Sequence, residues 1–158
     1  MASGKTLVLG IGNILMGDEG IGVHAVNYLE KHFSRPGVDY LDGGTGGFHL
    51  MEYFHQYHHV IILDAVLDGQ PPGTIHVLRP RFSRDYPPTL TAHDIGLKDM
   101  LDAIHLLQQQ PRITLVAVSI GKVPSLSTEL TAELQRVLPD IARTVCRILD
   151  EADGSSSG

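Results

Sequence analysis

Three side chains that bind metals stand where parallel strands of this sequence are expected to end. Glu19 lies in a glycine-rich loop after the first apolar run, Asp64 ends a third apolar run, and His93 follows a proline-rich segment. Carboxylate and imidazole groups are ligands of divalent metal ions, and three protein ligands leave coordination positions open to substrate or water. If the three segments converge at one edge of a sheet, they form a metal site with open positions.

Asp64 is the most informative of the three residues, because the four residues before it, VIIL, are all apolar. Burial of a lone carboxylate costs several kcal/mol, so Asp64 needs a metal, an arginine or backbone donors as a partner. Glu19 and its neighbour Asp18 have an ordinary alternative, since acidic residues at the start of a helix cap it or interact with its dipole. The ordinary alternative for His93 is a surface histidine before a helix.

A glycine-rich segment follows the second apolar run, with four glycines in the five positions from 43 to 47. Turn formation alone rarely needs so many glycines, so we expect a ligand or a peptide backbone to approach this loop closely. The residues predicted to bind substrate are Asp42, Gly43, Gly44, Thr45 and Gly46.

Three histidines that are close in sequence form a second candidate metal cluster. They are His55, His58 and His59. We favour a different interpretation, in which they end a helix, where cationic side chains complement the helix dipole. The GxSxG, HExxH and paired DTG signatures of common hydrolases do not occur in the chain.

Composition limits the class of protein. The chain has 158 residues, 12 Lys and Arg, 18 Asp and Glu, a formal net charge of −6 and one cysteine. Without a basic cluster, it is not expected to bind nucleic acid or an anionic membrane. The single cysteine excludes an internal disulfide and a CxxC metal site, and it indicates a reducing compartment. We therefore expect a cytoplasmic monomer with one domain over residues 1–150 and a flexible tail over 151–158.

The pattern of apolar residues predicts strands that alternate with helices. The link over residues 65–73 is too short for a parallel crossover, so the strand that follows it should pair antiparallel at an edge. The last helix should start near Ser127 or Thr128 and bend at Pro139. The expected strands cover 5–10, 38–42, 60–63, 74–79 and 112–120, and the other expected helices cover 20–32, 50–57 and 97–107.

These elements predict an α/β fold, a three-layer α/β/α sandwich. Its mostly parallel five-stranded sheet carries one antiparallel edge strand, and the third strand lies near the centre. In such sheets ligands bind beyond the carboxyl ends of the strands. Glu19 and Asp64 follow the first and third strands, and with His93 they are the residues expected to converge at one edge of the sheet.

Four blocks of sequence stand in order along the chain: LGIGNILMGDEGIGVHAV, LDGGTGG, IILDA and TAHDIGLKDML. Together they resemble the hydrogenase maturation proteases, which trim the carboxyl terminus of the nickel-iron hydrogenase large subunit. The resemblance extends over about residues 6 to 149. Its most specific part is GIGN followed by GDEGIG, a spacing that generic nucleotide-binding loops do not have.

The resemblance implies an α/β/α fold with a mixed five-stranded sheet. It also implies a metal site of one Glu, one Asp and one His, which fall on Glu19, Asp64 and His93. That site is expected to engage nickel already loaded into the large-subunit precursor, so that the metal marks the substrate as ready for removal of its C-terminal extension. The loop that begins at Asp42 is expected to lie against the substrate chain.

Two other classes of protein use similar residues. One is a noncatalytic nickel-binding chaperone with the same ligands. The other is a receiver-type phosphoacceptor domain, with Asp18 or Glu19, Asp64 and Lys122 as its site. The receiver is disfavoured because its acidic residues must lie at the strand tip to hold magnesium, whereas here they follow Gly10 by eight or nine residues across a glycine loop.

Overall fold

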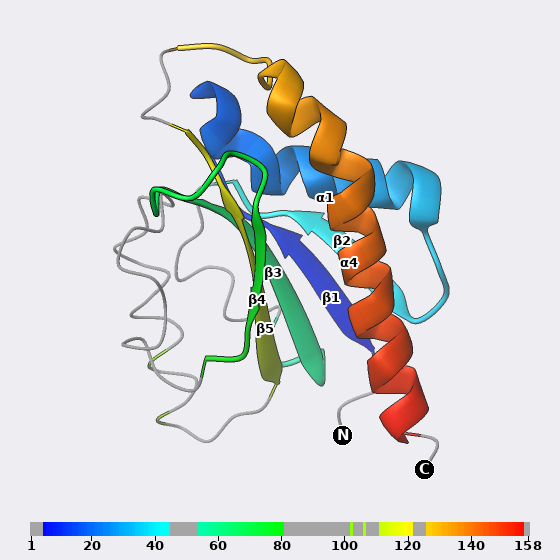
Figure 1. The fold of residues 1–158 in the computed structure, drawn as a ribbon. Coiled ribbons are helices and arrows are strands. Elements are labelled where there is room, and N and C mark those ends of the chain that lie inside the picture. The colour runs from blue at the N-terminus through cyan, green and yellow to red at the C-terminus, as the bar shows by residue number, and fades with distance from the viewer. Residues whose placement is uncertain are drawn as a thin grey trace.

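The computed structural model describes residues 5–44, 54–80, 102, 106, 111–121 and 126–156. Five strands form one sheet in the order β2-β1-β3-β5-β4 (Figure 1). The strands are β1 (Thr6–Gly10), β2 (Val38–Asp42), β3 (His59–Val66), β4 (Ile75–Leu78) and β5 (Arg112–Ser119). All neighbouring pairs are parallel except β4 and β5. The predicted mixed sheet, its antiparallel edge strand and its central third strand are confirmed.

Two helices, α1 (Ile21–Phe33) and α4 (Ala132–Ser156), cover the same face of the sheet (Figure 1). Side chains of β3 alternate between two apolar cores. Ile61, Leu63 and Ala65 pack with the two helices, whereas neighbouring positions face a second core on the opposite side. That second core includes Phe54 and Tyr57, but most of the helices predicted over 50–57 and 97–107 lie outside the described residues.

The first turn of α1 lies directly on the sheet because Gly22 has no side chain. A Cβ atom at Gly22 would lie 2.2 Å from the carbonyl oxygen of Leu63 and 2.3 Å from that of Ile11. Such distances are well inside van der Waals contact, so only glycine permits this approach. The short 3-10 helix η1 (Gly17–Gly20), which precedes α1, is thereby held at the carboxyl ends of β1 and β3.

The predicted start of α4 at Ser127 or Thr128 is wrong, because the helix begins at Ala132. The backbone of Ser127 pairs with the loop after β1 instead. Its N–H donates to the carbonyl of Leu15 at 2.9 Å, and its carbonyl accepts from the N–H of Gly17 at 2.7 Å. A residue that is extended in this pairing does not start a helix.

Asp18 then fixes the true start of α4. Its carboxylate accepts hydrogen bonds from the backbone N–H of Thr131 at 2.8 Å and from the Thr131 hydroxyl at 2.9 Å. From there α4 runs as one helix through Pro139, and the predicted bend at Pro139 stays a prediction. Within the described ranges, no helix has the length and apolar character needed to cross a membrane. α4 extends over residues 151–156 of the predicted tail, 151–158, and the flexibility of that tail stays a prediction.

Candidate metal and substrate site

Strands β1 and β2 end at the same level of the sheet, whereas β3 continues past its predicted end at Leu63 to Val66. Gly10, the last residue of β1, pairs with Asp42 of β2 on one side and with Leu63 of β3 on the other. Asp64 follows this row by one residue. The chain then stays close to β3, since the N–H of Ile11 donates to the carbonyl of Leu63 at 2.9 Å. The loop that leads to Glu19 and the loop that carries Gly43 and Gly44 therefore both start beside β3, close to Asp64.

Asp64 is a fully buried acid, with 0% of its surface exposed. Its Oδ1 accepts a hydrogen bond from the backbone N–H of Ala65 at 2.7 Å. By strand alternation its side chain lies on the same side as Ile62 and Val66, which pack in the core opposite α1 and α4. The structure thus supplies one of the partners that the sequence called for, a backbone donor, and Asp64 lies inside a buried strand, two residues before its end.

Glu19 is the second buried acid at this edge, with 3% of its surface exposed. It lies in η1, which packs against β3, the strand that carries Asp64. The loop before it folds back tightly, since a Cβ atom at Gly12 would lie 2.4 Å from the carbonyl oxygen of Glu19. Glu19 and Asp18, which share a turn, therefore differ in role. Asp18 binds the start of α4 and does not cap α1, the helix that the ordinary interpretation assigned to it, whereas Glu19 is buried at the sheet edge.

The third predicted ligand, His93, lies outside the described residues, as do Thr45 and Gly46 of the predicted substrate loop. Within the part of the chain that the structure describes, no three His, Cys, Asp or Glu side chains form a group able to hold a metal. The structure brings Glu19 and Asp64 to one edge, and the completion of their site by His93 stays a prediction.

The glycine loops after β1 and β2 lie side by side. Gly43 donates its N–H to the carbonyl of Gly10 at 2.8 Å, and Gly12 donates its N–H to the carbonyl of Gly44 at 2.7 Å. Asp42 stabilises the turn, because its Oδ1 accepts from the N–H of Gly44 at 2.9 Å. Asp42 itself is exposed. The backbone at this edge is thus free of bulky side chains where a substrate chain is expected to approach.

His24 of α1 belongs to the same edge and was not predicted as a site residue. Its Nε2 is buried and has no hydrogen-bond partner within the described residues. Burial lowers the pKa of His24, and the nearby carboxylates of Asp18 and Asp42 oppose this effect. The sequence offered one signal for His24 as a site residue, its position five residues after Glu19. A single histidine in an amphipathic helix is too common a feature to identify a site.

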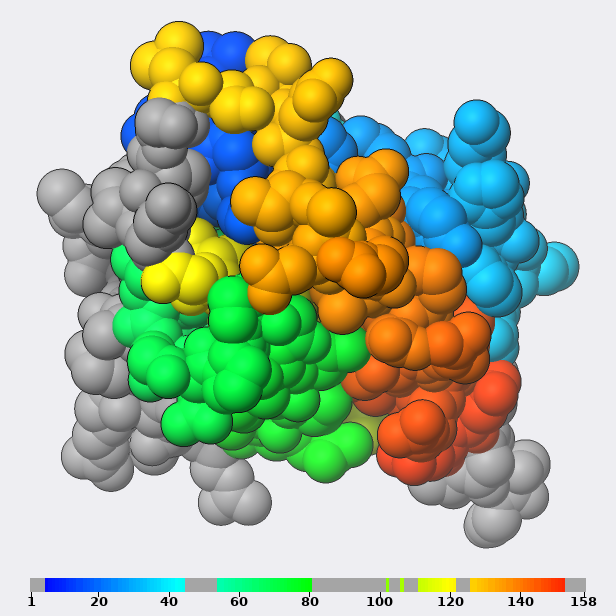
Figure 2. Space-filling model, turned by 45° about the horizontal axis from the view of Figure 1, so that its top comes forward, coloured from blue at the N-terminus to red at the C-terminus, as the bar shows by residue number. Residues whose placement is uncertain are grey.

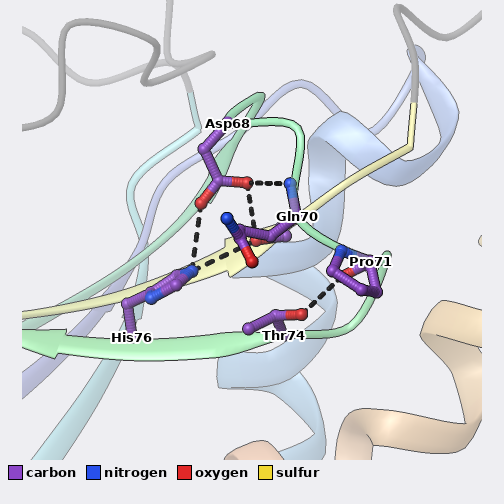
Figure 3. Close-up of polar contacts among 6 residues, drawn as sticks. Asp68, Gln70, Pro71, Thr74 and His76 are labelled. Carbon is purple, nitrogen blue, oxygen red and sulfur yellow. Dashed lines mark hydrogen bonds and ion pairs between the residues drawn. The ribbon is translucent and has the colours of Figure 1, made fainter.

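Asp68 in the link after β3, His76 of β4 and Ser119, the last residue of β5, form a polar cluster. Figure 3 shows Asp68 and His76 facing each other. The Ser119 hydroxyl donates to Asp68 Oδ1 at 2.9 Å, and His76 Nε2 lies 3.0 Å from Asp68 Oδ2 and 3.3 Å from Ser119 Oγ. This is not a catalytic triad, because serine donates to the carboxylate and not to the imidazole. Ser119 is also 0% exposed, so it has no access to a substrate.

The cluster instead fixes the link between β3 and β4. Burial raises the pKa of Asp68, but hydrogen bonds from Gln70 N–H and Ser119, with the charge of His76, outweigh it and lower that pKa. His76 pairs with Ala117, which pairs in turn with Asp64, so the cluster and Asp64 are one strand apart. No motif reveals this arrangement, because its members come from three elements that only the sheet register brings together.

The predicted role of the three histidines as helix-end cations is wrong for His59, which starts β3 and is 3% exposed. Its Nε2 lies 2.8 Å from the Thr114 hydroxyl. Burial, and then the positive charge of Arg112, lower the pKa of His59 to about 4, so the side chain is neutral near pH 7. It lies at the amino end of β3, away from the candidate site.

Comparison with known proteins identifies the family of this chain. The family model described as hydrogenase maturation protease matches residues 23–148. The chain belongs to this family. The hydrogenase maturation protease is 36% identical over 148 residues to the hydrogenase 2 maturation protease of Escherichia coli strain K12, an alignment that covers 85% of this chain and 88% of that protein. It is 34% identical over 151 residues to the hydrogenase expression/formation protein HupD of Rhizobium leguminosarum bv. viciae, covering 92% and 74% of the two chains.

The fold of the maturation protease matches a solved structure of the same kind. The hydrogenase maturating endopeptidase HybD from E. coli superposes with a TM-score of 0.83 at 34% identity, over 94% of this chain and 93% of that one. The protein is therefore an enzyme, an endopeptidase of hydrogenase maturation with an α/β sandwich fold. The family resemblance noted in the sequence is confirmed.

Proposed function

We propose that this maturation protease removes the C-terminal extension of the nickel-loaded large-subunit precursor of a nickel-iron hydrogenase. Glu19, Asp64 and His93 hold the nickel that the precursor carries. The observation that supports this role best is the burial of two carboxylates at one sheet edge, Asp64 at 0% and Glu19 at 3% exposure. Burial of a carboxylate costs free energy that its partners must compensate, and a bound cation would compensate the charge of both acids at once.

The chemistry of the donor set fits this substrate. Two carboxylates and one imidazole suit a borderline divalent ion. Because the proposed set has no thiolate, its affinity for nickel is expected to be moderate. Nickel is thus delivered by the precursor and is not a resident cofactor. When bound, a divalent ion supplies Lewis acidity for a carbonyl or a water molecule. The protein side chains fix its position, and three ligands leave room for groups of the substrate.

The paired glycine loops give the substrate chain its place. We assign to Asp42, Gly43, Gly44, Thr45 and Gly46 the contact with the backbone near the cleavage site. The turn that Asp42 holds at Gly44 keeps this loop in a fixed shape. A preformed loop reduces the entropy that the complex loses when a flexible extension becomes ordered. The single cysteine supports a cytoplasmic location for this activity.

The test is a processing assay with purified nickel-loaded precursor, in which loss of the extension shifts the band on a denaturing gel. Glu19→Gln, Asp64→Asn and His93→Ala should each lose most activity, because a site with two protein ligands loses affinity and geometry. Asp18→Asn is the matched control. It changes an acid in the same turn that contacts α4, and it should keep processing the precursor.

Full processing by Asp64→Asn would refute the role of the metal site. Thermal melts of each variant separate a local effect from loss of folding. Binding of nickel-loaded precursor without cleavage by the wild-type protein would support the noncatalytic chaperone instead.

A further inference from the structure

Three large apolar side chains are exposed beside the candidate site. Ile14 is 44% exposed, Leu15 is 54% exposed and Leu126 is 83% exposed. They come from two segments far apart in sequence, which the hydrogen bond from Ser127 N–H to the Leu15 carbonyl joins at 2.9 Å. In Figure 2 the gold atoms before α4 lie next to the blue atoms of the loop after β1. We call Ile14, Leu15 and Leu126 the apolar ledge.

The apolar ledge is continuous with the turn that carries Glu19. The N–H of Glu19 donates to the carbonyl of Met16 at 3.2 Å, directly after the two ledge residues of this loop. A macromolecule that presents a metal to Glu19 therefore has the ledge beside it, on the same loop. A free metal ion or a short peptide does not need such a surface.

We propose that the apolar ledge docks the folded body of the hydrogenase large-subunit precursor, through an apolar patch near its metal. This inference rests on the proposed function. Solvent-exposed leucines gain free energy when a partner removes them from water, and the centres of protein interfaces are enriched in such surface. Here the ledge lies where the substrate must arrive, so docking on it sets the position of the metal relative to Glu19.

The experiment compares Leu15→Asp and Leu126→Asp with a matched control, Phe33→Asp. Phe33 is also apolar and 38% exposed, but it ends α1, about 20 Å from the first turn of that helix. Each variant adds one negative charge, so the overall charge is equal. Steady-state processing of nickel-loaded precursor gives KM and kcat, and biolayer interferometry gives the affinity for the precursor without cleavage.

We expect each ledge variant to raise KM and Kd about tenfold, the effect of losing one interface anchor worth about 1.4 kcal/mol, with kcat unchanged at saturating precursor. Phe33→Asp should match the wild-type protein in all three values. Leu126→Asp should also keep the melting temperature of the wild-type protein, because a side chain this exposed packs little in the free protein.

The outcomes separate this inference from the proposed function. If the wild-type enzyme cleaves precursor and the ledge variants keep the wild-type KM and Kd, the inference is wrong and the proposed function stands. If the wild-type enzyme neither binds nor cleaves precursor, the proposed function itself fails. A wild-type dimer that the ledge variants dissociate, with KM unchanged, would assign the ledge to a second copy of the chain and overturn the inference.

Discussion

Replacement of His59 by Gln should remove a large part of the acid sensitivity of this fold. His59 is 3% exposed, with Nε2 at 2.8 Å from the Thr114 hydroxyl, and its folded-state pKa is lowered to about 4 from 6.5. Gln keeps a polar group that is able to reach Thr114 but does not titrate. The variant should therefore lose less stability than the wild type over the pH range in which His59 of the unfolded wild-type chain becomes protonated.

The magnitude follows from proton linkage. The two pKa values of 6.5 and about 4 differ by about 2.5 pH units. At about 1.4 kcal/mol per unit this difference is worth roughly 3 kcal/mol of unfolding free energy. Between pH 6.5 and 4 the unfolded chain binds a proton at this position and the folded protein does not. The contribution is therefore complete above about pH 6.5 and is lost as the pH falls to about 4.

Urea denaturation followed by circular dichroism at several pH values between 4 and 7.5 measures this effect. The carboxylates lower the stability of both proteins in acid, so the quantity of interest is the wild-type loss minus the His59→Gln loss. A constant difference at all pH values would reflect packing only. His55→Gln, at an exposed histidine, is the control and should keep the wild-type pH dependence. Equal pH dependence of wild type and His59→Gln would refute the reasoning.

Three further predictions concern packing, the polar cluster and the metal. Gly22→Ala should destabilise the protein by about 3 kcal/mol in urea melts, because its Cβ would lie 2.2 Å from the Leu63 carbonyl oxygen, and wild-type stability would contradict the close approach. Asp68→Asn should cost about 1 kcal/mol at pH 7. Since the folded-state pKa of Asp68 is lowered, this difference should shrink as the pH falls below the ordinary value of 3.8, and a difference that persists there would count against it. Purified enzyme should hold little nickel until precursor is present, and one tightly held nickel per chain after dialysis would contradict a moderate oxygen-rich site.

Much of the sheet follows from short-range properties of the sequence. The run before Asp64 is apolar without alternation, which indicates a strand buried on both faces, and β3 is the central strand. The link after β3 is too short for a crossover helix, so the antiparallel pairing of β4 follows from chain length alone. The position of Asp42 and Asp64 at one edge then follows from parallel pairing.

The errors come from long-range contacts that local chemistry does not encode. Ser127 has a side chain that often caps helices. Its backbone, however, forms hydrogen bonds with Leu15 and Gly17, more than a hundred residues earlier in the chain. His59 follows His55 and His58, yet it begins β3. There the hydroxyl of Thr114, two residues beyond the Arg112 that pairs with His59, lies 2.8 Å from its Nε2. Both outcomes depend on which segments become neighbours after folding.

β3 carries a buried titratable group near each end, and the two groups have different partners and different charges around them. His59 at the amino end meets a neutral hydroxyl and stays uncharged near pH 7, so its burial costs little there. Asp64 at the carboxyl end has a backbone donor from Ala65, beside an edge where Glu19 is also buried. The two acids attract a cation to the carboxyl end of β3. At the amino end, the positive charge of Arg112 would repel it. On the proposed function, the metal of the docked precursor offsets the desolvation of both acids, so the enzyme favours precursor that has received its metal over precursor that has not.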